Sequence, residues 1–268
     1  MRTTSRLLKA TSASSKAWLA RQSRDPYVKL RTTSGPKDGQ SDGTTSTSSY
    51  RSRSAFKLLQ LDDKHHLFRF DRISSNVVVD LGASPGGWSQ VVAEKMLSTR
   101  RNGGDGLTQT SSRSTLIAVD LLPMQPISGV SFIRQDFLAP EADEKISALL
   151  PSSKGADDDD GPAVDLILSD IAANQSGNSV RDAAMSLEVC EAVMRFAERH
   201  LKREDEDRDM KGGSLVMKYF VNLNTDEFFR DILKPSFCSA VRSKPASSRS
   251  ESSEFYFVCK GFKGTFQE

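Results

Sequence analysis

A glycine-rich segment follows a short run of β-branched residues and has the composition of a cofactor-binding loop. Val77-Val78-Val79-Asp80 is followed, after one leucine, by Gly82-Ala83-Ser84-Pro85-Gly86-Gly87-Trp88. Small residues let the backbone approach a ligand closely, and the helix expected from Trp88 onward presents unpaired N–H groups. The spacing is not that of a nicotinamide loop, and Pro85 lacks an N–H that a pyrophosphate would need. The segment therefore favours a cofactor without phosphate.

Two later apolar runs also end in carboxylates. Asp120 follows residues 115–119, where a carboxylate can accept hydrogen bonds from both hydroxyls of a ribose. Asp136 and Phe137 follow residues 130–133 and offer an acid and an apolar ring to the amino group and face of an adenine. Each aspartate alone is more often a helix cap or a turn residue. Three such strand ends in order favour an adenosine cofactor.

The elements that must position these residues alternate between two kinds. Short apolar runs at 76–81, 115–119, 130–133, 164–168 and 214–217, with a last run at 254–259, predict buried strands. Residues 88–97, 183–201 and 225–233 carry apolar side chains at helical spacing and predict crossover helices. The pattern predicts an α/β fold with a doubly wound sheet, whose ligand site lies at the carboxyl ends of the strands.

The N-terminal segment differs from the rest of the chain. Residues 1–24 are basic, rich in serine and threonine, and free of acids, which is typical of mitochondrial import signals. A basic tail that contacts RNA is the alternative. We expect residues 25–268 to form one domain with loop insertions near 32–49, 98–114 and 151–161, because these stretches lack apolar periodicity.

Bulk composition excludes several classes of protein. Cys190, Cys238 and Cys259 are isolated along the chain, which argues against a disulfide framework or a zinc site. No apolar run approaches the length of a membrane span, so we expect no membrane association. We also expect no metal, because no cluster of His, Cys and carboxylate residues suggests a site. The 37 basic and 35 acidic residues nearly cancel, so a nucleic-acid surface would require uneven placement of charge.

Several ordered segments together carry a family resemblance. They are Ser15-Lys16-Ala17-Trp18-Leu19, Asp25-Pro26-Tyr27-Val28, Arg51-Ser52-Arg53-Ser54-Ala55-Phe56-Lys57-Leu58, Asp80-Leu81-Gly82-Ala83-Ser84-Pro85-Gly86-Gly87-Trp88-Ser89-Gln90, Asp120-Leu121-Leu122-Pro123-Met124, Ser169-Asp170-Ile171-Ala172, Val216-Met217-Lys218, and Lys244-Pro245 with the stretch to Tyr256. In these segments, from about Ser14 to Lys263, the chain resembles the FtsJ family of ribosomal RNA 2′-O-methyltransferases, also called RrmJ.

The resemblance implies a Rossmann-like methyltransferase sheet with an antiparallel last strand, and S-adenosylmethionine as the methyl donor. By motif it implies four catalytic residues: Lys57, Asp170, Lys218 and Glu254. The implied cofactor-binding residues are Gly82, Pro85, Gly86, Gly87, Trp88, Asp120, Asp136, Phe137 and Asp170. The chain departs from the family in Ala173, where proline is usual, and in Tyr219, where valine is common.

These residue types suit methyl transfer to a ribose hydroxyl. The sulfonium methyl is already electrophilic, so the difficulty lies in a neutral hydroxyl that must lose its proton as it attacks. Lys218 is the candidate base or orienting group, and Lys57 would stabilise the developing alkoxide. Asp170 and Glu254 would orient the two ammonium groups.

We expect the protein to methylate a uridine in mitochondrial large-subunit ribosomal RNA, acting as a monomer on that RNA or on the large subunit. A transfer-RNA 2′-O-methyltransferase and a non-catalytic ribosome-assembly factor are the alternatives. The expected RNA contacts are Arg51, Arg53, Arg242, Lys244, Arg249 and the basic segment 16–31.

Overall fold

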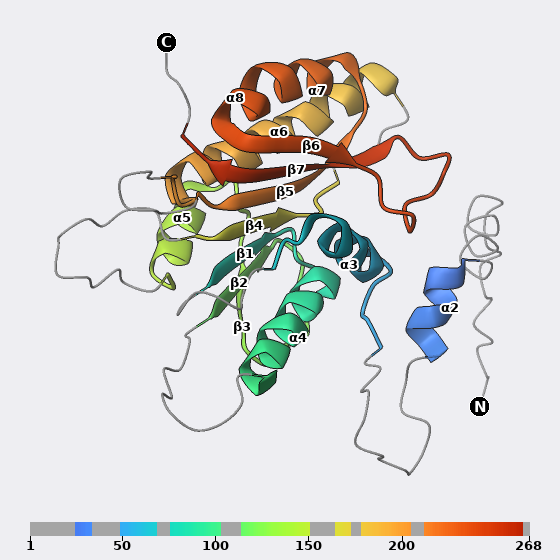
Figure 1. Ribbon diagram of the computed structural model, residues 1–268, viewed down its shortest axis with the longest axis vertical. Helices are drawn as coiled ribbons and strands as arrows, with labels where there is room; N and C mark the ends of the chain where they lie inside the picture. The colour runs from blue at the N-terminus through green and yellow to red at the C-terminus, as the bar shows by residue number, and fades with distance from the viewer. Residues whose placement is uncertain are drawn as a thin grey trace, which may run out of the picture.

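One mixed sheet forms the centre of the protein. The structure describes residues 25–33, 49–68, 76–102, 114–150, 164–172, 178–204 and 212–264. In the computed structural model, the strands are β1 (Val77–Leu81), β2 (Thr115–Asp120), β3 (Val130–Arg134), β4 (Leu166–Ser169), β5 (Ser214–Phe220), β6 (Phe237–Ser243) and β7 (Glu254–Phe262). They lie in the order β3-β2-β1-β4-β5-β7-β6 (Figure 1). The first five strands are parallel, and β7 runs antiparallel to both β5 and β6. The predicted fold class is confirmed.

Helices cover both faces of the sheet (Figure 1). They are α2 (Pro26–Thr33), α3 (Ser54–His65), α4 (Gly87–Asn102), α5 (Pro140–Ser147), α6 (Ser179–His200), α7 (Leu223–Phe228), the π-helical segment η1 (Phe229–Leu233) and α8 (Lys234–Ser236). α3 and α4 pack on one face, whereas α5, α6, α7 and η1 pack on the other. None of the helices in the described ranges is both long and apolar enough to cross a membrane.

The buried strand β1 shows how the sheet supplies two cores. Val77 and Val79 pack in the same cluster as Phe196 of α6, whereas Val78 packs with Leu58 of α3. Side chains two residues apart on a strand share a face. Asp80 therefore lies on the side of the sheet that α3 and α4 cover.

α3 is amphipathic and carries Lys57 beside its apolar stripe. Ala55, Leu58 and Leu61 are buried against the sheet, a spacing that repeats about every turn of a helix. The helix ends at His66, which adopts a left-handed conformation with φ 51°. Because Lys57 directly precedes Leu58, the packing of the stripe fixes the lysine near the sheet, where it is 9% exposed.

The structure also contains elements that the sequence patterns did not predict. Helices α2, α3, α5 and α8 and the edge strand β6 were not predicted, and β6 rather than β7 forms the edge of the sheet beyond β5. The helix predicted at 88–97 runs on to Asn102, and the one predicted at 225–233 is divided between α7 and η1. The segment 1–24 and most of the three predicted insertions lie outside the described residues, as does Ala173.

Candidate active site

The register between β5 and β7 brings polar residues together at the edge of the sheet where the parallel strands end. Lys218 pairs with Tyr256, and Phe220 pairs with Glu254. Residues two apart on a strand share a face, and diagonal neighbours across an antiparallel pair lie within reach of long side chains. Val216 belongs to the α3 core, so Lys218 faces α3, as do Tyr256 and Glu254. Asp170 follows β4 directly, next to Lys218.

The four residues predicted to be catalytic form two ion pairs at this edge. Nζ of Lys57 lies 2.6 Å from Oε1 of Glu254. Nζ of Lys218 lies 3.0 Å from Oδ1 of Asp170 and donates to the backbone oxygen of the same residue at 2.5 Å. We call Lys57, Asp170, Lys218 and Glu254 the tetrad. Both lysines are less than one-tenth exposed, so their charges face little solvent screening.

Tyr256 joins the two ion pairs. Its hydroxyl donates a hydrogen bond to Oδ1 of Asp170 at 2.7 Å. Burial raises the pKa of Tyr256 well above its ordinary value, and the negative charges of Asp170 and Glu254 raise it further. The phenol therefore stays protonated and acts as a donor toward the carboxylates. Nζ of Lys57 also lies 5.8 Å from the centre of the Tyr256 ring.

Glu254 is held in its charged form. Burial acts to raise the pKa of Glu254, but the charge and hydrogen bond of Lys57, with smaller contributions from Lys218 and Ser248, lower it below its ordinary value. The hydroxyl of Ser248 donates to Oε1 of Glu254 at 2.8 Å. The carboxylate thus has two partners that fix its position.

The glycine-rich loop next to the tetrad is packed so closely that side chains would not fit. A Cβ on Gly87 would lie 2.0 Å from Oγ of Ser52, and one on Gly82 would lie 2.2 Å from a carbon of Ile171. Gly82 and Gly86 also have positive φ angles, 74° and 107°, which favour glycine. Ser52 belongs to the segment before α3, so the loop and the helix that carries Lys57 are in contact.

Trp88 fixes the same junction. Its indole nitrogen donates to the backbone oxygen of Ser54 at 2.9 Å, and its ring centre lies 5.7 Å from that of Tyr256. At 2% exposure, Trp88 is a core residue. It therefore supports the loop from the core, and its predicted contact with the cofactor stays a prediction.

Asp80 is a buried acid at the base of the loop. Its Oδ2 accepts a hydrogen bond of 2.6 Å from Ser89, whereas its Oδ1 is buried without a hydrogen-bond partner among the described residues. Burial raises the pKa of Asp80 to about 7, and the charges of Asp170 and Asp120 contribute to the rise. An unpartnered buried carboxylate oxygen is costly and marks a place where a donor or a cation would be favourable.

Asp120 and Asp136, which were predicted to bind the cofactor, lie at neighbouring strand ends and have local partners. Asp120 accepts from the backbone N–H of Ser84 at 2.8 Å and from that of Leu122 at 2.7 Å. Asp136 accepts from the N–H of Leu138 at 3.0 Å. Asp120 thereby ties the cofactor loop to β2, and each of its oxygens keeps a second lone pair for a ligand. Phe137 is half-buried against the core.

Two arginines predicted to contact RNA have partners within the protein. Arg51 donates from Nη1 to the backbone oxygen of Gln125 at 2.5 Å and from Nη2 to that of Pro126 at 2.7 Å. Arg53 forms an ion pair with Asp25. Both guanidinium groups therefore have a folding role, and their contacts with RNA stay a prediction.

Two further basic residues are also engaged. Arg242 pairs with Asp226 at 2.7 Å and lies 4.4 Å from the ring centre of Phe229. Lys244 donates to the backbone oxygens of Ser250 and Ser252 at 3.1 and 2.7 Å. The Arg242 contacts tie β6 to α7 and η1, whereas those of Lys244 fold the loop between β6 and β7. Arg249, in the same loop, is half-buried.

The departure from the family at Tyr219 does not reach the tetrad. Tyr219 lies on the opposite face of β5 from Lys218 and stacks on Phe257 with ring centres 3.6 Å apart. Its hydroxyl is buried without a hydrogen-bond partner among the described residues. The substitution is therefore accommodated in the core.

Tyr256, Ser248 and Asp80 were not predicted as site residues. Tyr256 and Glu254 are two residues apart on one strand, and this period of two was a signal that would have placed them on one face. Asp80 ends the predicted first strand, like the aspartates that were selected. Ser248 lies in a serine-rich loop, where the sequence does not distinguish it from its neighbours.

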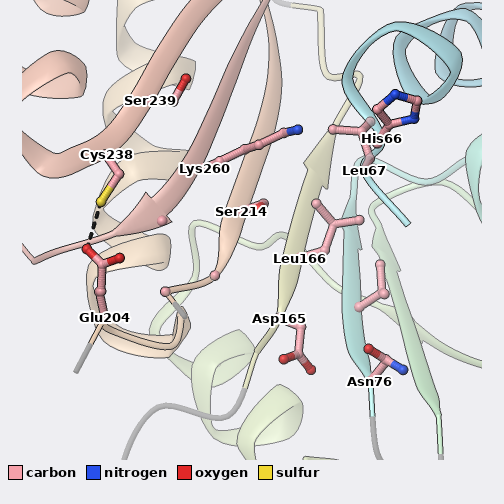
Figure 2. Close-up of a pocket in the computed structure, with 14 residues that line it drawn as sticks. His66, Leu67, Asn76, Asp165, Leu166, Glu204, Ser214, Cys238, Ser239 and Lys260 are labelled. Atoms are coloured by element: carbon pink, nitrogen blue, oxygen red, sulfur yellow. Dashed lines mark hydrogen bonds between the residues drawn. The ribbon is translucent and has the colours of Figure 1, made fainter. Parts of the chain in front are cut away.

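A cavity of about 330 Å³ lies elsewhere, at the opposite edge of the sheet. Figure 2 shows Asn76, Ser214 and Lys260 among the residues that line it. Asn76 precedes β1 and Ser214 begins β5, whereas the tetrad lies where the parallel strands end. Ligands of doubly wound sheets bind at the carboxyl ends of the strands, so the tetrad, rather than this cavity, marks the candidate active site.

Known proteins resemble this chain in sequence and in fold. Residues 50–262 match the model of the FtsJ-like methyltransferase family. The Ribosomal RNA large subunit methyltransferase E of Novosphingobium aromaticivorans is 37% identical over 256 residues, which cover 96% of this chain and 92% of that protein. The protein of the same name from Rhodopseudomonas palustris, strain BisA53, is 38% identical over 251 residues, which cover 94% and 86%.

A solved structure is also similar. A ribosomal RNA methyltransferase from Plasmodium falciparum superposes with a TM-score of 0.59 at 28% sequence identity, covering 80% of this chain and all of that one. The family match spans β1 to β7 and includes the whole tetrad. The chain belongs to the FtsJ-like methyltransferase family.

Proposed function

We propose that the protein transfers a methyl group from S-adenosylmethionine to the ribose 2′-hydroxyl of a uridine in mitochondrial large-subunit ribosomal RNA. The observation that carries the proposal is the pair of buried contacts Lys57–Glu254 and Lys218–Asp170, which Tyr256 connects beside a glycine-rich loop. Two positioned ammonium groups suit a reaction in which an oxygen loses a proton and gains negative charge.

The residues of the loop fit the donor that the family implies. S-adenosylmethionine supplies an activated methyl group on a sulfonium centre and carries no phosphate. Gly82, Gly86 and Gly87 let Ile171, Met124 and Ser52 pack directly on the loop, which fixes the path of its backbone beside the strand ends. The unpartnered oxygen of Asp80 suits a ligand ammonium group, and Asp120 has lone pairs for ribose hydroxyls.

The tetrad would act on the acceptor rather than on the donor. Asp170 receives two contacts from the Lys218 ammonium or amine, one at Oδ1 and one at its backbone oxygen. An ammonium has three donors, and a neutral amine has two donors and a lone pair. In both states one direction of Lys218 remains for the 2′-hydroxyl. Lys57, oriented by Glu254, would stabilise the charge that develops on the oxygen.

Ribosomal RNA as the substrate is supported by the names of the bacterial and Plasmodium relatives. The choice of uridine rests on the resemblance to the FtsJ family.

A mitochondrial location is supported by the basic, acid-free composition of residues 1–24. A fusion of these residues to a fluorescent protein should enter mitochondria, and replacement of Arg2, Arg6 and Arg21 by glutamate should prevent entry.

Mapping of ribose methylation in cells with and without the protein tests the substrate. We expect one uridine of the mitochondrial large-subunit RNA to lose its 2′-O-methyl group and to regain it with the wild-type chain but not with Lys218→Ala. Loss confined to transfer RNA would favour the transfer-RNA enzyme. A requirement for the protein in ribosome assembly without any loss of methylation would favour the non-catalytic factor.

A further inference from the structure

The start of the described N-terminal segment is bound to the residue that precedes α3. Asp25 forms an ion pair with Nη1 of Arg53, and its carboxylate also accepts from the backbone N–H of Tyr27 at 3.0 Å. The side chain of Asp25 is 8% exposed and that of Arg53 is 21% exposed. Asp25 thus caps α2 and binds a cation at the same time, which fixes both groups away from bulk water.

Arg53 extends this contact to the loop between β6 and β7, which we call the acceptor loop (residues 244–253). Its Nη2 donates to the backbone oxygen of Ser247 at 2.5 Å. The backbone N–H of Ser247 donates to Oε1 of Gln60 at 2.8 Å. Nε2 of Gln60 in turn donates to the hydroxyl of Tyr27 at 3.2 Å. The backbone oxygen of Ser247 is therefore held by the residue before α3 and its N–H by α3 itself, and the N-terminal segment contacts both Arg53 and Gln60.

The next residue of the acceptor loop contacts the tetrad. Ser248 donates to Oε1 of Glu254, the oxygen that also binds Nζ of Lys57. Ser247 is 1% exposed and Ser248 is 7% exposed, so the loop has little room to shift without breaking these contacts. Lys57 lies in the first turn of α3, after the N-cap residue Arg53 and before Gln60, and these two residues hold the loop.

We propose that Asp25 and Arg53 form a positioning clamp for the acceptor side of the active site, by fixing Ser247 and thereby the Ser248–Glu254–Lys57 contacts. The inference rests on the proposed function. It gives the N-terminal segment a role in the geometry of the reaction rather than in RNA charge neutralisation. Within the described ranges neither Asp25 nor Arg53 forms a hydrogen bond or ion pair with a tetrad side chain, so they act through the loop.

Asp25→Asn in the full chain tests the clamp. Asparagine keeps the cap on α2 but removes the charge that binds Arg53. We expect kcat to fall about 10- to 100-fold, the loss typical of small misplacements of reacting groups, with the KM for S-adenosylmethionine changed less than about twofold. Arg53→Lys should lower kcat in the same way, since lysine lacks the planar guanidinium group that reaches two acceptors. Asp25→Glu should restore most of the activity.

Asp143→Asn is the matched control, because Asp143 binds Arg199 at 2.7 Å in an ion pair between α5 and α6, on the other face of the sheet. We expect it to leave kcat unchanged. If the ion pair of Asp25 were purely structural, Asp25→Asn would lower the melting temperature as Asp143→Asn does, without a selective effect on kcat.

Two readouts separate the clamp from general destabilisation. Hydrogen exchange of residues 244–253 should speed up in Asp25→Asn and stay at the wild-type rate in Asp143→Asn. The hydrogen bond from Ser248 lowers the pKa of Glu254, so a released loop should raise this pKa and move the acidic limb of the kcat–pH profile to higher pH. Glu254 also faces Lys57, Lys218 and Tyr256 and, beyond Tyr256, Asp170. Ser248→Ala should reproduce that movement with Asp25 intact.

The outcomes are distinct. Unchanged exchange of residues 244–253 in Asp25→Asn overturns the clamp, whatever the activity. Faster exchange with unchanged kcat shows that the loop does not set the geometry and also overturns the proposal. A wild-type chain that methylates no ribose 2′-hydroxyl overturns the proposed function itself, whereas an active wild type with an inactive Lys218→Ala and a fully active Asp25→Asn overturns the clamp alone.

Discussion

The hydroxyl of Tyr256 lies 2.7 Å from Oδ1 of Asp170 and donates a hydrogen bond to it. Lys218 binds the same carboxylate oxygen at 3.0 Å. One oxygen of Asp170 therefore receives a neutral donor and a cationic partner. Because Tyr256 is fully buried, its donor cannot be replaced by solvent without repacking.

Tyr256→Phe should lower kcat about tenfold, the factor that corresponds to about 1.4 kcal/mol, a plausible value for one buried hydrogen bond to a charged group. The apolar ring remains in place, so the fold and the binding of S-adenosylmethionine should change little. Steady-state kinetics on the RNA substrate and calorimetric titration with the donor measure the two effects.

Tyr219→Phe is the control for this change, since the buried hydroxyl of Tyr219 has no hydrogen-bond partner among the described residues. Its activity and stability should equal or exceed those of the wild type. Equal kcat in the Tyr256 and Tyr219 variants would show that the bond to Asp170 does not contribute to the reaction.

Lys218→Ala should lose at least about 100-fold in kcat, as expected when a positioned proton acceptor is removed, with the dissociation constant for S-adenosylmethionine changed less than about twofold. Lys218→Arg is more informative, because arginine keeps a positive charge but does not give up its proton. An inactive arginine variant supports Lys218 as the base, whereas substantial activity means that Lys218 orients the hydroxyl as a cation. Lys202→Ala, which removes an ion pair with Asp165 at the other edge of the sheet, should remain active.

The buried strands were predictable from the sequence because β1, β2 and β4 lie between two helical layers and consist of continuous apolar runs. β6 was not, since it is an edge strand with most of its side chains exposed and no apolar run to detect. Helix α3 was missed for a related reason. Its apolar stripe is interrupted by Lys57 and Asp62, polar residues that are buried through specific contacts.

The tetrad was identified from motifs, whereas its partners depend on long-range contacts. Arg51 and Arg53 are close to Lys57 in sequence, and their charge suggested RNA binding. Their acceptors lie 74 and 194 residues away, at Gln125 and Ser247. A charge pattern states that a side chain needs a partner, but it does not state whether that partner is a phosphate or a folded backbone.

Asp80 predicts a pH dependence of donor binding. Its pKa is raised to about 7 by burial, so the acid is largely neutral below that pH. A ligand ammonium group near Oδ1 favours the charged form and lowers the pKa in the complex, so binding releases a proton. The affinity for S-adenosylmethionine should therefore rise as the pH increases from about 6 to about 7.5, a range below the ordinary α-amino pKa of about 7.7.

Calorimetric titration in buffers with different ionisation enthalpies measures this proton release directly. Asp80→Asn, which keeps the shape of the side chain, should bind more weakly at pH 7.5 and lose the dependence on pH. A wild-type affinity that stays constant over this range would show that Asp80 does not meet the ammonium group.

We expect Arg51 to position the cofactor loop of the active site, as Arg53 is proposed to position the acceptor loop. Its two bonds hold residues 125 and 126, and a Cβ on Gly86 would lie 3.2 Å from its Nη1, so the guanidinium group packs directly on the cofactor loop. Arg51→Gln removes the fork that reaches both carbonyls. We expect the KM for S-adenosylmethionine to rise about tenfold, with kcat at saturating donor changed less than about threefold, because uniform binding is lost rather than transition-state contacts. Arg199→Gln, an exposed ion-pair partner on α6, is the control and should leave both constants unchanged. A fall in kcat without a change in KM would instead place Arg51 on the acceptor side with Arg53.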